Sequence, residues 1–247
     1  MRAVIMAGGK GIRLHPYTKI IPKPLIPLNE IPILEVILRQ LQYHGFTHVT
    51  LTLNYKARLI QTYFGDGKEL GLNIDYTVED KEMGTIGPLT LIENLNEPFL
   101  LMNADILTDL DFRKFYKEHI DSNAIGTVML YNHSLNVDFG VVERNSIGEI
   151  TDYLEKPSHD LLISSGIYML NPESIFYLNK DEEIGAPEFL KKLIKSQKIV
   201  KSYTHEGVWM DIGTKRGLDL ATDFFQKNKN QLLNLSKENL IEKDRVV

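Results

Sequence analysis

The first 27 residues join a short apolar run to a glycine-rich loop that carries two cations. Residues 3–6 read Ala-Val-Ile-Met, which is long enough for a buried strand. Three glycines follow within residues 8–11, where the lack of a Cβ lets backbone N–H groups converge on an anion. Arg13 adds a planar fork of donors, and Lys23 adds a point charge between two prolines that restrict its backbone. This order predicts a phosphate-binding loop at the end of a strand.

The glycine spacing differs from two common phosphate-binding motifs. It is neither G-x-G-x-x-G, the dinucleotide-binding fingerprint, nor G-x-x-x-x-G-K-[ST], the P-loop. The whole stretch GGKGIRLHPYTKIIPKP instead resembles the signature GGxGTRLxPxTxxxPKP of the sugar-phosphate nucleotidylyltransferases. Ile12 stands where that family usually has Thr or Ser, so one hydroxyl that would reach a phosphate is missing.

The composition argues against several other classes of protein. With 247 residues, 43% of them hydrophobic, the chain can bury the core of one large domain. A formal net charge of −5 without a basic stripe argues against nucleic acid as a partner. No apolar run approaches about 18 residues and no leader is recognisable, so neither a membrane span nor a signal peptide is expected. The absence of cysteine excludes disulfides and fits a cytoplasmic protein.

Strand and helix patterns alternate through the first half of the chain. Strands are predicted over residues 3–6, 47–53, 72–78 and 99–102, and helices over residues 33–44, 57–64 and 84–94. In the second half, strands are predicted over residues 125–131, 140–143, 149–154, 163–170, 199–203 and 208–210, with a helix over 186–196. The fold class predicted is therefore α/β: a Rossmann-like, mostly parallel central sheet flanked by helices, with a β-rich lobe added.

We expect a single domain over residues 1–227, because no Pro/Gly/Ser-rich linker interrupts the chain. A nucleotide lobe would occupy roughly residues 1–110 and a sugar lobe roughly residues 111–213. We expect residues 228–247, which are charged and in which leucine and isoleucine recur, to form a helical tail. Either this tail packs on its own domain, or it contacts a partner such as a second copy of the chain.

Two aspartates follow predicted strands and are candidate metal ligands. Asp105 comes after the apolar stretch 99–102, at the sheet edge where open α/β folds bind ligands. It matches the family's NGD motif with Ala104 in place of Gly, and Asp211 lies in WMDIG, which resembles the family's W-x-D-I-G. The resemblance implies that Asp105 and Asp211 hold Mg²⁺ together with phosphate oxygens. Taken alone, an aspartate after a strand is more often a turn residue or a helix cap, and Asp211 would then cap a helix that starts near Thr214.

Three further motifs occur in the family's order and imply a sugar-phosphate site. They are FGV around Gly140, EKP at residues 155–157 and SGIY at residues 165–168. In the family the glutamate accepts hydrogen bonds from sugar hydroxyls, and the lysine neutralises the sugar phosphate. The residues implied for sugar-phosphate binding are Asn103, Gly140, Glu155, Lys156 and Ser165.

In the family, the segment that corresponds to VEDKEMGT at residues 78–85 faces the base of the nucleotide, so it indicates which base is bound. Relatives that transfer uridylyl or thymidylyl groups usually have Gln in place of Glu79, whereas a carboxylate accepts both N1–H and the N2 amino group of guanine. Because an unpaired polar group is costly, such a site discriminates between bases. The alternative is that Glu79 is a solvent-facing loop charge. The residues implied for nucleotide binding are Ala7, Gly8, Gly9, Gly11, Glu79, Gly84 and Thr85.

The resemblance implies transfer of a nucleotidyl group from GTP, or another NTP, to a sugar-1-phosphate with Mg²⁺ as cofactor. Arg13 and Lys23 are the implied catalytic residues, because positioning and charge neutralisation dominate phosphoryl-transfer catalysis. Mannose-1-phosphate is the commonest acceptor in guanylyl transfer, and heptose-1-phosphate is another. Three alternatives remain: the same chemistry with UTP, dTTP or CTP, cytidylyl transfer to a phospho-alcohol, and a catalytically silent sensor that binds a sugar nucleotide.

Overall fold

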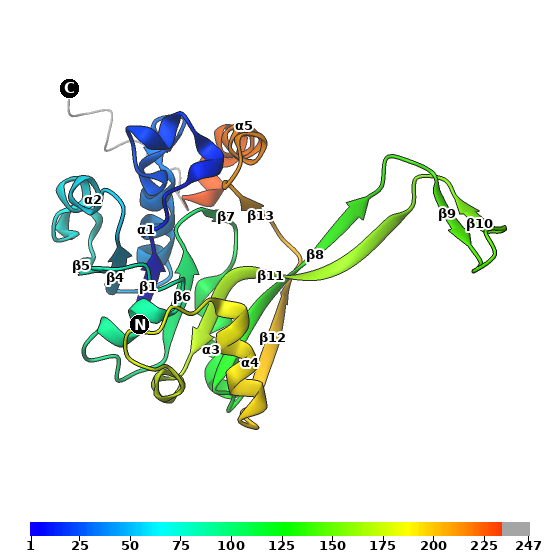
Figure 1. Ribbon diagram of the computed structural model, residues 1–247. Helices are drawn as coiled ribbons and strands as arrows, with labels where there is room; N and C mark the ends of the chain where they lie inside the picture. The colour runs from blue at the N-terminus through cyan, green and yellow to red at the C-terminus, as the bar shows by residue number, and fades with distance from the viewer. Residues whose placement is uncertain (234–247) are drawn as a thin grey trace.

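A seven-stranded sheet forms the centre of the computed structural model, which describes residues 1–233 (Figure 1). Its strand order is β12-β8-β11-β6-β1-β4-β5. The strands are β1 Arg2–Met6, β4 His48–Leu53, β5 Asn73–Val78, β6 Phe99–Asn103, β8 Gly126–Asn136, β11 Ser158–Leu170 and β12 Val200–His205. β11 is antiparallel to both of its neighbours, and every other pair in the sheet is parallel. The predicted α/β class with a mostly parallel sheet is confirmed.

Both faces of the central strands β6, β1 and β4 are buried, and alternate residues of each strand point to opposite sides. In β1, Ala3 and Ile5 pack into one apolar cluster, whereas Val4 packs into the other. The first cluster contains apolar residues of four helices: α1 Ile33–Tyr43, α2 Ala57–Phe64, α3 Phe112–Asp121 and α5 Lys215–Leu232. The second contains residues of α4 Ala186–Lys195 and of the 3₁₀ helix η5 Gly87–Leu91. The sheet therefore lies between two helical layers, as the alternating pattern predicts.

Short strand pairs and 3₁₀ turns complete the chain. Three two-stranded ladders pair β2 Pro27–Leu28 with β3 Ile31–Pro32, β7 Ile106–Thr108 with β13 Trp209–Asp211, and β9 Val141–Arg144 with β10 Ile150–Leu154. The other short 3₁₀ helices are η1 Ile12–Leu14, η2 Tyr17–Lys19, η3 Lys23–Leu25, η4 Lys68–Leu70 and η6 Pro172–Tyr177. Within the described residues, no helix is both long and apolar enough to cross a membrane.

Two elements differ from the sequence-based expectation. The helix predicted over residues 84–94 is only the short 3₁₀ turn η5, because Gly84 has a φ of +72° and Pro88 follows within the turn. Helix α3 was not predicted, although Asp111 caps it by accepting a hydrogen bond from the Lys114 N–H at 2.9 Å. Helix α5 continues from the domain expected over residues 1–227 into the expected helical tail, of which residues 234–247 lie outside the described part.

The second half of the sheet extends into a long arm. After residue 130 of β8 and before residue 165 of β11, the two strands lie outside the body as a paired ribbon that leads to the β9–β10 hairpin (Figure 1). We call residues 131–164 the arm. It contains the FGV and EKP motifs, so the arrangement of the arm decides where these motifs lie relative to the body.

Candidate active site

A cavity of about 600 Å³ opens at the carboxyl ends of β1 and β6. From β1 the chain continues to β4 and β5 on one side, whereas β6 pairs with the other side of β1. Strand order therefore reverses at β1, and this is the position where open α/β sheets bind ligands. The loop after β1, the segment after β5 and the end of β6 supply most of the lining.

The glycine loop after β1 is held by the body at both ends. The Ala7 N–H donates to the Thr52 carbonyl at 2.9 Å, and the Thr18 hydroxyl donates to the Gly11 carbonyl at 2.8 Å. Gly11 has a φ of +62°, and a Cβ there would lie 2.8 Å from the Thr18 side chain. A Cβ on Gly9 would meet no atom within 4 Å. The loop thus has a fixed backbone with an open surface at Gly9, as a phosphate-binding loop requires.

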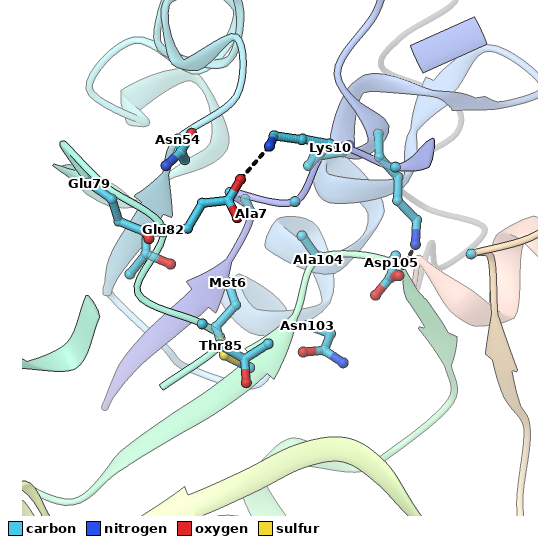
Figure 2. A pocket seen from close by; sticks show the side chains of 18 of the residues that line it. Met6, Ala7, Lys10, Asn54, Glu79, Glu82, Thr85, Asn103, Ala104 and Asp105 are labelled. Carbon is cyan, nitrogen blue, oxygen red and sulfur yellow. Dashed lines mark hydrogen bonds and ion pairs between the residues drawn. The ribbon is translucent and has the colours of Figure 1, made fainter. Parts of the chain in front are cut away.

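Lys23 and Asp105 form an ion pair at one end of the cavity. Figure 2 shows Asp105 at this end. Lys23 opens the 3₁₀ turn η3, and Asp105 follows β6, so the pair joins the front loop to the central sheet. Only 13% of the lysine side chain and 21% of the aspartate side chain are exposed. Each charge is thereby held in the pocket by the other.

Asp211 lies beside this pair. β13 pairs with β7, and the Ile212 N–H donates to the Asp105 carbonyl at 3.0 Å, which brings the two aspartates to neighbouring positions. The Asp211 carboxylate accepts from the Gly213 N–H at 2.6 Å, and Arg13 Nη2 lies 3.9 Å from its other oxygen. A Cβ on Gly213 would come within 3.1 Å of Arg13, Asp211 and Lys23. The Asp211 carboxylate and two cations therefore converge around this glycine, and Lys23 links them to Asp105.

The carboxylates of Asp105 and Asp211 suit a Mg²⁺ ion that is also bound by phosphate oxygens. Mg²⁺ is usually held by one or two carboxylates while phosphates and water supply the remaining oxygens. Asp105 and Asp211 supply two carboxylates, and residues 1–233 contain no cluster of three or more acidic, histidine or cysteine ligands. In this structure the positive charge of Lys23 faces Asp105, and that of Arg13 faces Asp211.

Glu79 lies at the far end of the pocket from Asp105 (Figure 2). One carboxylate oxygen accepts from the Met83 N–H at 3.0 Å, and the other lies beside Gly8. Burial raises the pKa of Glu79 above its ordinary value, and the charge of Glu82 adds to this shift, while the Met83 hydrogen bond opposes it. Glu79 is therefore a half-buried, oriented carboxylate that faces the cavity rather than a free loop charge.

The Gly84–Thr85 segment is fixed by the loop before α4. A Cβ on Gly84 would lie 2.5 Å from the Ile184 carbonyl oxygen, so only glycine allows this approach. The Thr85 hydroxyl accepts from the Ala186 N–H at 3.1 Å. Close packing against residues 184–186 therefore holds this wall of the pocket.

The structure brings most of the predicted site residues together. Eleven line the cavity: Ala7, Gly8, Gly9, Gly11, Arg13, Lys23, Glu79, Gly84, Thr85, Asn103 and Asp105. Asp211 lies next to them through its contact with Arg13. Gly140, Glu155 and Lys156 lie on the arm and are not part of the lining. The Ser165 hydroxyl donates to the Met129 carbonyl at 2.8 Å, which anchors the base of the arm.

Several lining residues were missed from the sequence: Lys10, Thr52, Asn54, Glu82, Glu183 and Gly213. Lys10 pairs with Glu82 across the cavity mouth (Figure 2), and both residues stand inside motifs that the sequence analysis identified. Gly213 likewise belongs to the WMDIG segment. Glu183 follows η6 and has no neighbouring motif, so no sequence signal indicated it.

Comparison with known proteins finds one family whose model spans most of the chain. A family model described as nucleotidyl transferase matches residues 2–228. The UTP–glucose-1-phosphate uridylyltransferase of Synechocystis sp. is 32% identical over 233 residues, which are 86% of this chain and 60% of that protein. The mannose-1-phosphate guanyltransferase of Saccharomyces cerevisiae is 31% identical over 223 residues, which are 86% of this chain and 61% of that protein. The chain thus spans less than two thirds of the length of these relatives.

A solved structure shares the fold. The crystal structure of a putative glucose-1-phosphate thymidylyltransferase from Bacillus anthracis superposes with a TM-score of 0.74 at 24% sequence identity. The alignment covers 91% of this chain and 95% of that one. The fold of this chain, with its central sheet between helical layers, is therefore a known arrangement.

Proposed function

Because the chain belongs to the nucleotidyl transferase family, we propose that it is a sugar-1-phosphate nucleotidylyltransferase that uses GTP. The observation that carries the proposal is the arrangement of Lys23, Asp105, Asp211 and Arg13 at one end of a cavity whose other end holds Glu79. The first group suits phosphates and their metal ion, and the second suits a base.

In the proposed reaction, a phosphate oxygen of the sugar-1-phosphate attacks the α-phosphorus of the NTP in line. The new P–O bond forms as the bond to the bridging oxygen breaks, and pyrophosphate leaves. No covalent enzyme intermediate is needed, because the acceptor phosphate is already a nucleophile. The chain has to hold both substrates in line and neutralise charge.

Each group of the site has one task in this proposal. The N–H groups of the glycine loop and Arg13 hold the β- and γ-phosphates that leave as pyrophosphate. Lys23 lies deeper, next to Asp105, and stabilises charge on the α-phosphate. Asp105 and Asp211 would hold Mg²⁺, which supplies Lewis-acid stabilisation of the phosphates.

Glu79 supports guanine as the base. Its carboxylate is oriented by the hydrogen bond from the Met83 N–H. It lies at the end of the pocket opposite Asp105, where the phosphates are proposed to bind. Guanine offers two adjacent donors to such an acceptor, whereas uracil and thymine would place carbonyl oxygens against it. We propose mannose-1-phosphate or a related hexose- or heptose-1-phosphate as the acceptor, since relatives named for mannose-1-phosphate are among those found.

The test is pyrophosphate release with Mg²⁺ across GTP, UTP, dTTP, CTP and ATP against several sugar-1-phosphates. We expect release with GTP and a hexose- or heptose-1-phosphate. Release only with pyrimidine nucleotides would keep the reaction and refute the role of Glu79. Nucleotide binding without release in every combination would favour a silent sensor of sugar nucleotides.

A further inference from the structure

Asn54 and Glu79 occupy equivalent positions after two neighbouring strands. β4 and β5 run parallel, their register pairs Leu53 with Val78, and the Glu79 N–H donates to the Leu53 carbonyl at 2.9 Å. The residue that follows each strand is therefore placed at the same edge of the sheet, one strand spacing from the other. Both residues line the cavity, and Figure 2 shows both at the end away from Asp105.

Gly8 brings the glycine loop against both side chains. A Cβ on Gly8 would lie 3.0 Å from the Glu79 carboxylate oxygen Oε1 and 3.3 Å from the Asn54 Cβ. The Tyr55 N–H donates to the Gly8 carbonyl at 3.4 Å, and the Tyr55 hydroxyl donates to the Thr18 carbonyl at 3.1 Å. The backbone next to Asn54 is thereby tied to the loop, so the Asn54 side chain starts from a fixed position beside Glu79.

The Asn54 amide is available to a ligand. The residue is partly exposed in the cavity wall, and among the described residues its amide forms no hydrogen bond. An asparagine amide carries two N–H donors and one carbonyl acceptor, and half a turn of the amide exchanges them. Lys10, a charged donor that also lines the cavity, is paired with Glu82. Asn54 therefore offers a donor next to the acceptor oxygens of Glu79.

The hydrogen-bonding edge of guanine needs both kinds of group. It presents the O6 acceptor, the N1–H donor and the N2 amino donor in one row. A carboxylate accepts from N1–H and from the amino group, but it repels O6, and an acceptor left unpaired in a pocket is costly. An amide N–H beside the carboxylate removes this cost. Adenine has an amino group in place of O6 and an acceptor nitrogen in place of N1–H, so it would face Glu79 with the wrong group.

We propose that Asn54 determines base specificity together with Glu79: its amide N–H donates to O6 of guanine, while Glu79 accepts from N1–H and the N2 amino group. This inference rests on the proposed use of GTP. It assigns the acceptor atom of the base to the residue after β4, and the donors of the base to the residue after β5. The two contacts are separable, because each is lost with a different change of the base.

The test uses nucleotides that differ from GTP at one position of this edge. 6-Thio-GTP keeps N1–H and the amino group but carries sulfur, a poor acceptor, in place of O6. ITP keeps O6 and N1–H but lacks the N2 amino group. Dissociation constants are measured by titration calorimetry of the full chain with Mg²⁺ present. We expect the unmodified chain to bind GTP about tenfold more tightly than either analogue, since each analogue loses one hydrogen bond.

Asn54→Ala should abolish the preference for GTP over 6-thio-GTP and retain the preference for GTP over ITP. Glu79→Gln should show the opposite pattern. Asn73→Ala is the matched control, because Asn73 is an exposed asparagine at the opposite end of β5, and both preferences should persist in it. If Asn54→Ala retains the preference for GTP over 6-thio-GTP, or loses both preferences to the same extent, Asn54 does not read O6 and the proposal fails.

Asn54→Asp covers the case in which alanine at this position prevents folding. Aspartate has nearly the size of asparagine but faces O6 with an acceptor. The affinity for GTP should therefore fall at least about tenfold, and the preference over 6-thio-GTP should disappear. Unchanged affinity for GTP in Asn54→Asp would overturn the proposal.

Two outcomes separate this inference from the proposed function. If the unmodified chain binds GTP selectively but releases no pyrophosphate with any acceptor, the proposed function fails, and the dissociation constants still decide the role of Asn54. If the unmodified chain binds UTP or dTTP more tightly than GTP, the assignment of the base and the role of Asn54 fail together, while pyrophosphate release with those nucleotides would retain the reaction.

Discussion

Lys23 pairs with Asp105 across the end of the pocket although 82 residues separate them in the chain. The lysine belongs to the loop that follows β1, and the aspartate follows the neighbouring strand β6. Parallel pairing of these strands brings both residues to the same edge of the sheet. The front loop and the centre of the sheet are therefore linked by charges that also face the ligand cavity.

We expect Lys23→Ala to lower kcat about a hundredfold or more, equal to about 2.7 kcal/mol of lost transition-state stabilisation. The cation is proposed to act on charge that develops at the α-phosphate, so kcat should fall more than KM rises. Steady-state kinetics with GTP and the best acceptor measure the effect. Lys19→Ala is the control, because Lys19 is exposed and lies outside the cavity lining. Near-normal kcat in Lys23→Ala would refute the assigned role.

Asp211→Asn separates charge from local structure. The asparagine oxygen can still accept the Gly213 N–H that Asp211 accepts at 2.6 Å, so the turn should persist. We expect the Mg²⁺ concentration for half-maximal activity to rise at least about tenfold, because neutral oxygen is a weaker ligand than carboxylate. A Mg²⁺ titration measures this, with Asp219→Asn on the exposed face of α5 as control. An unchanged Mg²⁺ requirement would remove Asp211 from the metal site.

The sequence identified the parts of the site that are local in the chain. The strand–glycine loop, Glu79 and the aspartates after β6 and in β13 are each marked by a pattern of a few residues, and the structure places them around one cavity. Gly213 was missed although it belongs to the WMDIG segment, and Glu183 was missed because its position depends on long-range packing. Helix α3 was missed because it lies between two strands, in the half of the chain for which mostly strands were predicted.

The position of the arm could not be predicted from motifs. FGV and EKP indicate a sugar-phosphate site by resemblance, but a strand pattern does not say whether the paired strands lie on the body or project from it. That choice depends on the register shift between Ser164 and Tyr168, and on Trp209, which donates to the Ser165 carbonyl at 2.9 Å. Both features involve contacts between segments far apart in sequence.

Two glycines of the front loop should separate binding from folding. Gly11→Ala forces a φ of +62° on alanine and places its Cβ 2.8 Å from Thr18, so we expect a destabilised protein. Gly9→Ala meets no protein atom, so its thermal unfolding midpoint should be unchanged while KM for the nucleotide rises. Thermal unfolding and KM are measured for both variants. An unchanged KM in Gly9→Ala would indicate that the phosphates do not approach the loop there.

Stability should fall as the pH is lowered below the ordinary pKa of histidine. His119 is buried between Thr127 and Asn171, and burial lowers its pKa from 6.5. It therefore stays neutral in the fold where the unfolded chain already takes up a proton, so this stability is present above pH 6.5 and lost as the pH falls below it. Urea unfolding at pH 7.5 and 5.5 measures the loss.

The control for the pH effect is His119→Gln. Glutamine does not bind a proton in this pH range, but its amide can still form hydrogen bonds. Its loss of stability between the two pH values should be smaller than that of the unmodified chain. Part of the loss should persist, because burial also lowers the pKa of His44, against the opposing charge of Asp111. An identical loss in both proteins would show that His119 does not control the dependence.

Glu79→Gln tests which base the pocket accepts. The amide oxygen can still accept the Met83 N–H, but the amide no longer offers guanine two acceptors, so we expect kcat/KM to fall for GTP and to rise for UTP or dTTP.

Burial raises the pKa of Glu79, so GTP activity of the unmodified chain should decline with falling pH earlier than an ordinary glutamate would cause. The variant should lack this decline and, having lost a desolvated charge, unfold at the same temperature or higher at neutral pH. If the ratio of GTP to UTP activity is the same in both proteins, Glu79 does not read the base.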